Sequence, residues 1–140
     1  MGCAEGIRLF YVGDSEKREC LYHNFEIVTS GGVCVGRCFL KEGDENIIMT
    51  TGNVGYSVDA EHRGHGYASA ALRELADAAR ECGISRLVIC CFAENVASAR
   101  SCENAGARFD AEISLCESDP SYAYGKRRVK RYFLDVPAKM

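Results

Sequence analysis

The stretch "DAEHRGHGYASA" at residues 59–70 decides the fold, because it joins a strand to a helix through glycine. The run before it, "NVGYSV" (53–58), is rich in β-forming residues, and small helix-forming residues follow it. Within the turn, Arg63 stands beside Gly64 and Gly66. The first N–H groups of a helix lack acceptors and lie at the positive end of the helix dipole, and glycine lets a bulky anion approach them. The stretch therefore predicts an anion site, and a pyrophosphate is its natural guest.

The helix predicted after this turn is amphipathic. Apolar and small residues recur every three or four positions over 68–82, charged residues occupy the other face, and Gly83 is placed to cap the end. The next run, "SRLVICCF" (85–92), lacks alternation and is typical of a strand buried on both faces. Asn95 is then placed to begin a shorter helix and Gly106 to end it.

The other β-rich runs lie on either side of this unit. We expect strands at 7–12, 24–29, 33–40, 53–58, 85–92, 107–113 and 129–136. The turn "SGG" makes 24–40 a hairpin, and "KEGDEN" is taken as a polar connector. This order predicts a single domain over 1–140 of α/β class: a mixed sheet flanked by helices, with parallel pairing across the unit 53–92.

Composition narrows the function classes. A net charge of −3 over 140 residues gives no electrostatic case for a nucleic-acid partner, and no apolar run approaches the roughly 20 residues of a membrane span. The nine cysteines show no C-x-x-C spacing, which favours reduced thiols in a cytoplasmic protein. His62 and His65 have the H-x-x-H letters, but a glycine-rich turn gives them no fixed helical spacing, so we predict no metal.

The segment from Arg63 to Ala68 matches [R/Q]-x-x-G-x-[G/A], and here the sequence resembles the GCN5-related N-acetyltransferase (GNAT) family, whose acetyl-CoA signature has this form. A second block, "ENVASARSCENAGARF" (94–109), resembles the later asparagine segment of the family and follows in the right order. The resemblance covers about 24–136, is specific within 53–109, and is greatest to an uncharacterised bacterial-type branch. It implies a GNAT-like fold, acetyl-CoA as co-substrate, no metal, and direct transfer of acetyl to an amine of a small molecule or peptide.

The same resemblance assigns the cofactor contacts. The turn and helix start would hold the coenzyme A pyrophosphate, and the strand end would pair its backbone with the pantetheine arm. A backbone N–H near Ser57 or Val58 would polarise the thioester carbonyl. The residues implied are Tyr56, Ser57, Val58, Arg63, Gly64, His65, Gly66, Tyr67, Ala68, Ser69, Asn95 and Ser98.

Two catalytic candidates follow, each with a structural alternative. The place where family members often carry a tyrosine as general acid holds Cys102, which is otherwise a packed thiol. Glu94 would act as a base through water, and is otherwise a solvated carboxylate.

The acceptor side departs from the family. Only "GDSEKRECLYH" (13–23) separates the first two expected strands, where the family usually has two helices that roof the acceptor pocket. This shortened helical region leaves the acceptor site open or completed by a second subunit, which is a possible homodimer. The rival function is a coenzyme A-binding module without catalysis.

Overall fold

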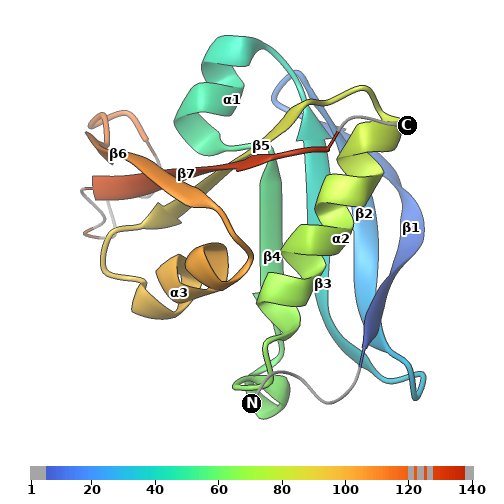
Figure 1. The fold of residues 1–140 in the computed structure, drawn as a ribbon. Coiled ribbons are helices and arrows are strands. Elements are labelled where there is room, and N and C mark those ends of the chain that lie inside the picture. Colours follow the sequence, from blue (N-terminus) through green and yellow to red (C-terminus); the bar gives the residue numbers. More distant parts are fainter. Residues whose placement is uncertain (1–5, 120–121, 123–124, 126–127, 138–140) are drawn as a thin grey trace.

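The computed structural model describes residues 6–119, 122, 125 and 128–137 (Figure 1). Its strands form two sheets, one with the order β1-β2-β3-β4 and one with the order β5-β7-β6. The elements are β1 (Ile7–Lys17), β2 (Cys20–Thr29), β3 (Cys34–Glu42), α1 (Glu45–Thr51), β4 (Val54–Val58), a 3-10 turn (Ala60–His62), α2 (Tyr67–Glu81), β5 (Arg86–Phe92), α3 (Val96–Asn104), β6 (Arg108–Ser114) and β7 (Arg128–Asp135). The mixed α and β composition matches the expected fold class.

The first two strands form a long hairpin, so the expectation that 13–23 is a connector is wrong. Asp14 lies opposite His23, and Lys17 lies opposite Cys20. Arg18 and Glu19 form the turn with φ values of 51° and 65°, the backbone that matches the twist of a two-residue hairpin. The charged residues of β1 hide its strand character because they lie on an exposed edge strand, where pairing rather than propensity decides the structure. β1 thus passes directly into β2, without helices between them.

A short helix, α1, replaces the connector expected at "KEGDEN", which is a second correction. Asp44 caps it, since its side chain accepts the N–H of Asn46 at 2.8 Å. Ile48 packs against Val88 and Phe133, so the helix has a buried side of its own. Gly52 ends the helix with a φ of 83°, and a Cβ there would lie 2.8 Å from the Val88 carbonyl oxygen.

The strands β4 and β5 are clamped together at Asn53. Its backbone N–H donates to the Val88 carbonyl at 2.8 Å, its side-chain oxygen accepts the Val88 N–H at 2.7 Å, and its side-chain nitrogen donates to the Arg86 carbonyl at 3.1 Å. β5 pairs with β7 along its whole length, and beyond the clamp it diverges from β4 (Figure 1). The expected parallel pairing is therefore wrong, and every strand pair among the described residues is antiparallel.

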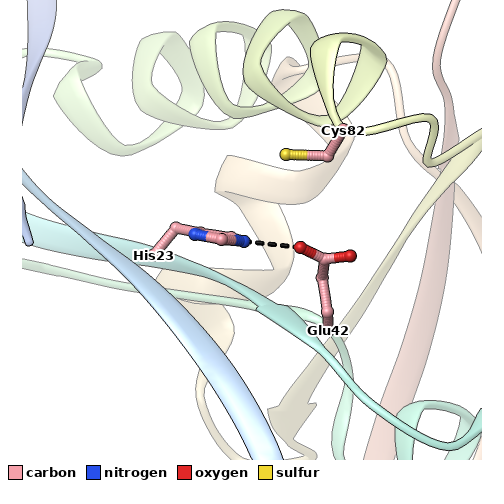
Figure 2. Close-up of side chains that lie close together, drawn as sticks. All are labelled: His23, Glu42 and Cys82. Carbon is pink, nitrogen blue, oxygen red and sulfur yellow. Dashed lines mark hydrogen bonds and ion pairs between the residues drawn. The ribbon is translucent and has the colours of Figure 1, made fainter. Parts of the chain in front are cut away.

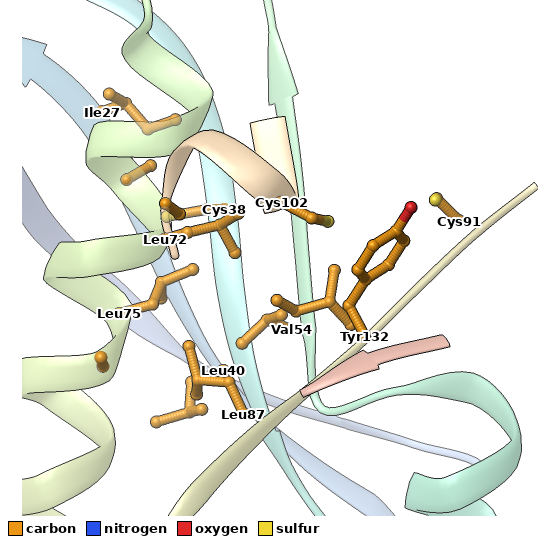
Figure 3. Packing of buried hydrophobic residues seen from close by; sticks show 14 of the residues in the cluster. Ile27, Cys38, Leu40, Val54, Leu72, Leu75, Leu87, Cys91, Cys102 and Tyr132 are labelled. Carbon is orange, nitrogen blue, oxygen red and sulfur yellow. The ribbon is translucent and has the colours of Figure 1, made fainter. Parts of the chain in front are cut away.

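One hydrophobic core joins both sheets. Leu72 and Leu75 of α2 have no exposed surface and pack over the first sheet, and Leu87 of β5 and Tyr132 of β7 belong to the same cluster (Figure 3). Burying one such leucine stabilises the fold by about 1.5–3 kcal/mol. The core thereby fixes both ends of α2 relative to β4 and β5. None of the helices in the described ranges is long and apolar enough to cross a membrane.

Candidate functional site

A groove of about 620 Å³ opens where the end of β4, the first turn of α2 and one side of α3 come together. It lies on the side of β4 from which β5 has diverged. Its lining residues are Tyr56, Ser57, Val58, His62, Arg63, Gly64, Gly66, Tyr67, Ala68, Ser69, Asn95, Ala97, Ser98, Arg100, Ser101 and Asn104.

The start of α2 presents backbone donors to this groove. Gly66 is the N-cap residue in the left-handed region, with a φ of 78°, and has no side chain with which to cap the helix. The N–H groups of Ala68 and Ser69 have no acceptor within the helix, because they precede its first hydrogen-bonded turn. Gly64 has a φ of 87°, and no described atom lies within 4 Å of where its Cβ would be. The turn thus requires glycine for its backbone and leaves room for a bulky anion.

The register of β4 decides which backbone groups face the groove. Ser57 lies opposite Arg37 of β3, and the N–H of Asp59 donates to the Val35 carbonyl at 2.8 Å. Because backbone groups alternate along an antiparallel pair, the N–H of Ser57 points towards β3 and that of Val58 points away from it. Of the two expected oxyanion donors, Val58 is the one whose N–H lies on the open edge.

Side chains tie the three parts of the groove together. The Nε–H of Arg63 donates to the Val58 carbonyl at 3.0 Å, which holds this exposed cation at the end of β4. The Ser69 hydroxyl donates to the Ser101 carbonyl at 3.0 Å and joins α2 to α3.

Tyr56 reaches from β4 to α3. Its hydroxyl lies 2.7 Å from the Ser98 hydroxyl and 3.7 Å from the Cys102 sulfur. Asn95 orders this end of α3, since its side chain accepts the Ser98 N–H at 3.1 Å. Burial raises the pKa of Tyr56, so its hydroxyl keeps its proton at neutral pH.

A second cavity of about 370 Å³ meets the groove at Tyr56, Asn95 and Ser98. It lies between the diverging strands and below α1. Its other lining residues are Thr50, Thr51, Val54, Gly55, Ile89, Cys90, Cys91, Phe92, Leu115, Asp119 and Val129. A molecule in the groove and another in this cavity would meet beside the Tyr56 hydroxyl.

The structure brings together every expected cofactor residue except His65, which stacks on Tyr67 at 5.5 Å between ring centres and does not line the groove. The two catalytic candidates lie outside both cavities. Glu94 is exposed, and Cys102 has no exposed surface. The hydrogen bond to Cys91 and burial both raise the pKa of Cys102.

Several lining residues have no counterpart in the sequence-based prediction. Thr51 comes from the unexpected helix α1, for which Asp44 before an apolar pair is the available signal. Arg100 and Asn104 are four residues apart on α3, so they lie on the same face of this helix, and both line the groove. Asn53, which lines neither cavity but joins β4 to β5, carries no signal in the sequence, since its role depends on two backbone groups more than thirty residues away.

Solved structures share this fold. A GNAT-family acetyltransferase from Bacillus anthracis aligns with a TM-score of 0.63 and 20% identity, over 80% of this chain and 65% of that protein. The microcin C7 self-immunity acetyltransferase MccE, solved with acetyl-CoA and AMP, also gives a TM-score of 0.63 at 20% identity, over 82% of this chain and 61% of its own. YncA from Salmonella typhimurium, solved with acetyl-CoA, aligns with a TM-score of 0.62 and 19% identity, over 85% of this chain and 67% of its own. The chain thus spans about two thirds of the length of these proteins.

No curated protein matches the sequence. A family model described as the acetyltransferase (GNAT) domain matches residues 4–108, which is well over half of the chain. The chain belongs to the GNAT acetyltransferase family.

Proposed function

We propose that this protein is an acetyl-CoA-dependent N-acetyltransferase that transfers acetyl to a primary amine. One observation carries the proposal: the glycine turn, the start of α2 and the open edge of β4 line a single groove. A pyrophosphate requires an anion site, a pantetheine arm a strand edge, and a thioester a hydrogen-bond donor, and the groove offers these three along its length.

The cofactor would lie along the groove with its pyrophosphate at the start of α2. The N–H groups of Ala68 and Ser69 would bind phosphate oxygens, and the exposed guanidinium of Arg63 would add a full positive charge. The pantetheine amides would pair with the backbone N–H and C=O of Tyr56 on the open edge of β4, as an added strand does at a sheet edge, and the Val58 N–H stays available for the thioester carbonyl. Gly64 leaves the space that the phosphates need.

In the reaction, a neutral amine attacks the thioester carbonyl, the C–N bond forms, the C–S bond breaks, and the proton lost by the amine ends on the thiolate of coenzyme A. The Val58 N–H would stabilise the negative oxygen of the tetrahedral intermediate. Holding the two reactants together would supply much of the rate.

Tyr56 is the better placed partner for the leaving thiolate, compared with Cys102 or Glu94. Its hydroxyl lies where the groove and the second cavity meet, whereas Cys102 is buried behind it. A thiol has a pKa of about 8.5, so a tyrosine with a raised pKa donates a hydrogen bond to the thiolate rather than its proton. We propose that Tyr56 stabilises the thiolate in this way.

The second cavity is the proposed entry for the acceptor amine, a small molecule or an amine of a peptide. It ends beside Tyr56, on the side of β4 away from the start of α2.

A homodimer stays a prediction. It is supported by β1, an eleven-residue edge strand on which Phe10 and Val12 are 62% and 55% exposed, because such an edge is a template for pairing with a second copy. Sedimentation velocity at two protein concentrations tests it, and a monomer at both would contradict it.

The cytoplasm is the proposed location. All eight described cysteines are free thiols, as in proteins of reducing compartments.

Calorimetry with acetyl-CoA tests the cofactor site. Gly64→Asp sets a carboxylate against the pyrophosphate and should abolish binding. Gly83→Asp is the matched control: Gly83 follows the other end of α2, has a φ of 77°, and has nothing within 4 Å of its Cβ position. It carries the same backbone strain and the same new charge, and should bind normally. Failure of the wild-type protein to bind at high micromolar acetyl-CoA would overturn the proposal.

The alternative is a coenzyme A-binding module without catalysis, which is favoured by the burial of Cys102. Small amines, polyamines and peptides should be screened with wild-type protein, and free coenzyme A measured by chromatography because the protein's own thiols consume thiol reagents. Tight binding of acetyl-CoA without turnover for any acceptor class would establish this alternative.

A further inference from the structure

Three potential metal ligands gather at the C-terminal end of α2, far from the groove. His23 comes from β2, Glu42 from the end of β3, and Cys82 is the C-cap residue of α2. The Nε2 atom of His23 lies 2.6 Å from a Glu42 carboxylate oxygen, and the ligand atoms of all three residues lie within 4.8 Å of one another. Figure 2 shows the Cys82 sulfur directed towards the space above the other two.

The dimensions of this cluster suit a tetrahedral cation. With Zn–N and Zn–O distances of about 2.0–2.1 Å and a Zn–S distance of about 2.3 Å, the ligand atoms of a zinc site lie roughly 3.3–3.7 Å apart. The imidazole nitrogen and the carboxylate oxygen, 2.6 Å apart, would move apart, and the sulfur, which lies within 4.8 Å of both, would move closer to them by up to about 1.5 Å. Side-chain rotation at Glu42 and Cys82 supplies such movements, because both are partly open to solvent.

A fourth residue orients the imidazole for this task. The Nδ1 atom of His23 lies 2.9 Å from a carboxylate oxygen of Asp14, and the same oxygen accepts the Tyr11 hydroxyl at 2.7 Å. A carboxylate on one ring nitrogen fixes the proton there and leaves the other nitrogen as the ligand, the arrangement that supports histidine ligands of metals. It is independent of the first three residues and points to the same use of Nε2.

The local field also favours a divalent cation. The carboxylates of Glu42, Asp14 and Glu81 lie near Cys82 and attract a cation. The C-terminal end of a helix adds partial negative charge, and Cys82 stands at that end of α2. A zinc ion would bind the Cys82 sulfur as a thiolate.

We propose that His23, Glu42 and Cys82 bind one zinc ion, with water as the fourth ligand and Asp14 as the positioning residue on the imidazole. On binding, the Cys82 thiol loses its proton to solvent and Nε2 of His23 binds without a proton, so a Zn²⁺ ion with one thiolate and one carboxylate leaves a neutral centre. The site joins the end of α2 to β2 and β3 and takes no part in acetyl transfer. Ligands at positions 23, 42 and 82 match no short metal motif, which is why the sequence alone predicts none.

Metal titration of the reduced full-length chain tests the proposal. Wild-type protein, stripped with a chelator, should bind one equivalent of zinc, and the cobalt form should show the visible bands of a tetrahedral site with a sulfur-to-cobalt charge-transfer band. Cys82→Ser should remove the charge-transfer band, and His23→Gln should weaken zinc binding at least as much. Asp14→Asn should weaken it roughly ten- to hundredfold, with the charge-transfer band retained at saturation.

Cys116→Ser is the control for adventitious binding by surface thiols. Cys116 is exposed, and its hydrogen bond with Ser118 lowers its pKa, so a nonspecific site would use it before Cys82. This variant should bind zinc as wild type does. Absence of stoichiometric binding, or binding that survives in Cys82→Ser and is lost in Cys116→Ser, would reduce the cluster to an imidazolium held between two carboxylates.

Discussion

Tyr56 is the side chain on which the two cavities converge, and its hydroxyl is the atom whose removal says most about the chemistry. Tyr56→Phe keeps the ring and deletes the hydrogen bond proposed for the leaving thiolate. A hydrogen bond to a charged group contributes about 1.5–3 kcal/mol, so we expect kcat to fall roughly ten- to hundredfold with KM for acetyl-CoA little changed. Tyr22→Phe is the control, because Tyr22 packs against Phe39 and lines neither cavity. An equal loss in both variants would assign the effect to packing.

Cys90 and Cys91 are neighbours whose thiol pKa values are shifted in opposite directions. Burial raises the pKa of Cys90 to about 11, whereas the hydrogen bond from Cys102 lowers the pKa of Cys91. Both line the second cavity, and the thiolate is the reacting form, so iodoacetamide near pH 7.5 should modify Cys91 well before Cys90. Cys102→Ser replaces the sulfur donor, and the alkylation rate of Cys91 should change while that of Cys90 does not. Tandem mass spectrometry of the peptide distinguishes the two, and equal rates would contradict the prediction.

At the scale of elements, the junction between β4 and β5 depends on Asn53. Its side chain is 5% exposed and satisfies the Arg86 carbonyl and the Val88 N–H. Asn53→Ala leaves both groups buried without this partner, which costs about 1–3 kcal/mol for each, and we expect the free energy of unfolding to fall by about 2–5 kcal/mol. Urea unfolding measures this, with the exposed Asn46 of α1 replaced by Ala as control. A fall of less than 1 kcal/mol in the free energy of unfolding would show that water satisfies the Arg86 carbonyl and the Val88 N–H in place of the Asn53 side chain.

The elements that the sequence predicted are those whose pattern is local and long. The helix starting at Tyr67 shows continuous helical periodicity, the strand ending at Phe92 is an unbroken apolar run, and the glycine turn has a mechanism of its own. Helix α1 was missed because seven residues give too few turns for a periodic signal. The parallel pairing was wrong because adjacency in the chain does not guarantee adjacency in a sheet: Asn53 joins β4 to β5 at one point, and β5 pairs with β7.

The same limit applies to the site. The residues predicted to hold the cofactor come from two segments, and all of them except His65 line one groove. The hydrogen bond between the Tyr56 and Ser98 hydroxyls joins residues 42 positions apart, and no local sequence pattern predicts it. The register that selects the Val58 N–H over that of Ser57 likewise depends on pairing with β3.

For the whole molecule, α2 acts as a rod with one proposed site at each end. Its 15 residues span about 22 Å, which separates the pyrophosphate turn at Gly64 from the zinc cluster at Cys82. Both ends pack into one core, so each ligand stabilises the same cooperative unit. A ligand that binds only the folded state adds about 2.7 kcal/mol to the free energy of unfolding when present at a hundred times its dissociation constant.

We therefore expect coenzyme A and zinc to stabilise the protein additively, to within about 0.5 kcal/mol, because sites this far apart share no partners. Gly64→Asp should cancel the increment from coenzyme A alone, and Cys82→Ser the increment from zinc alone. Urea unfolding under a phosphine reductant, with each ligand singly and with both, measures the four free energies for each variant. A shortfall above 1 kcal/mol in the doubly liganded wild type would mean that α2 couples its ends. Loss of the coenzyme A increment in Cys82→Ser would instead mean that the two ligands share one site, against the separation proposed here.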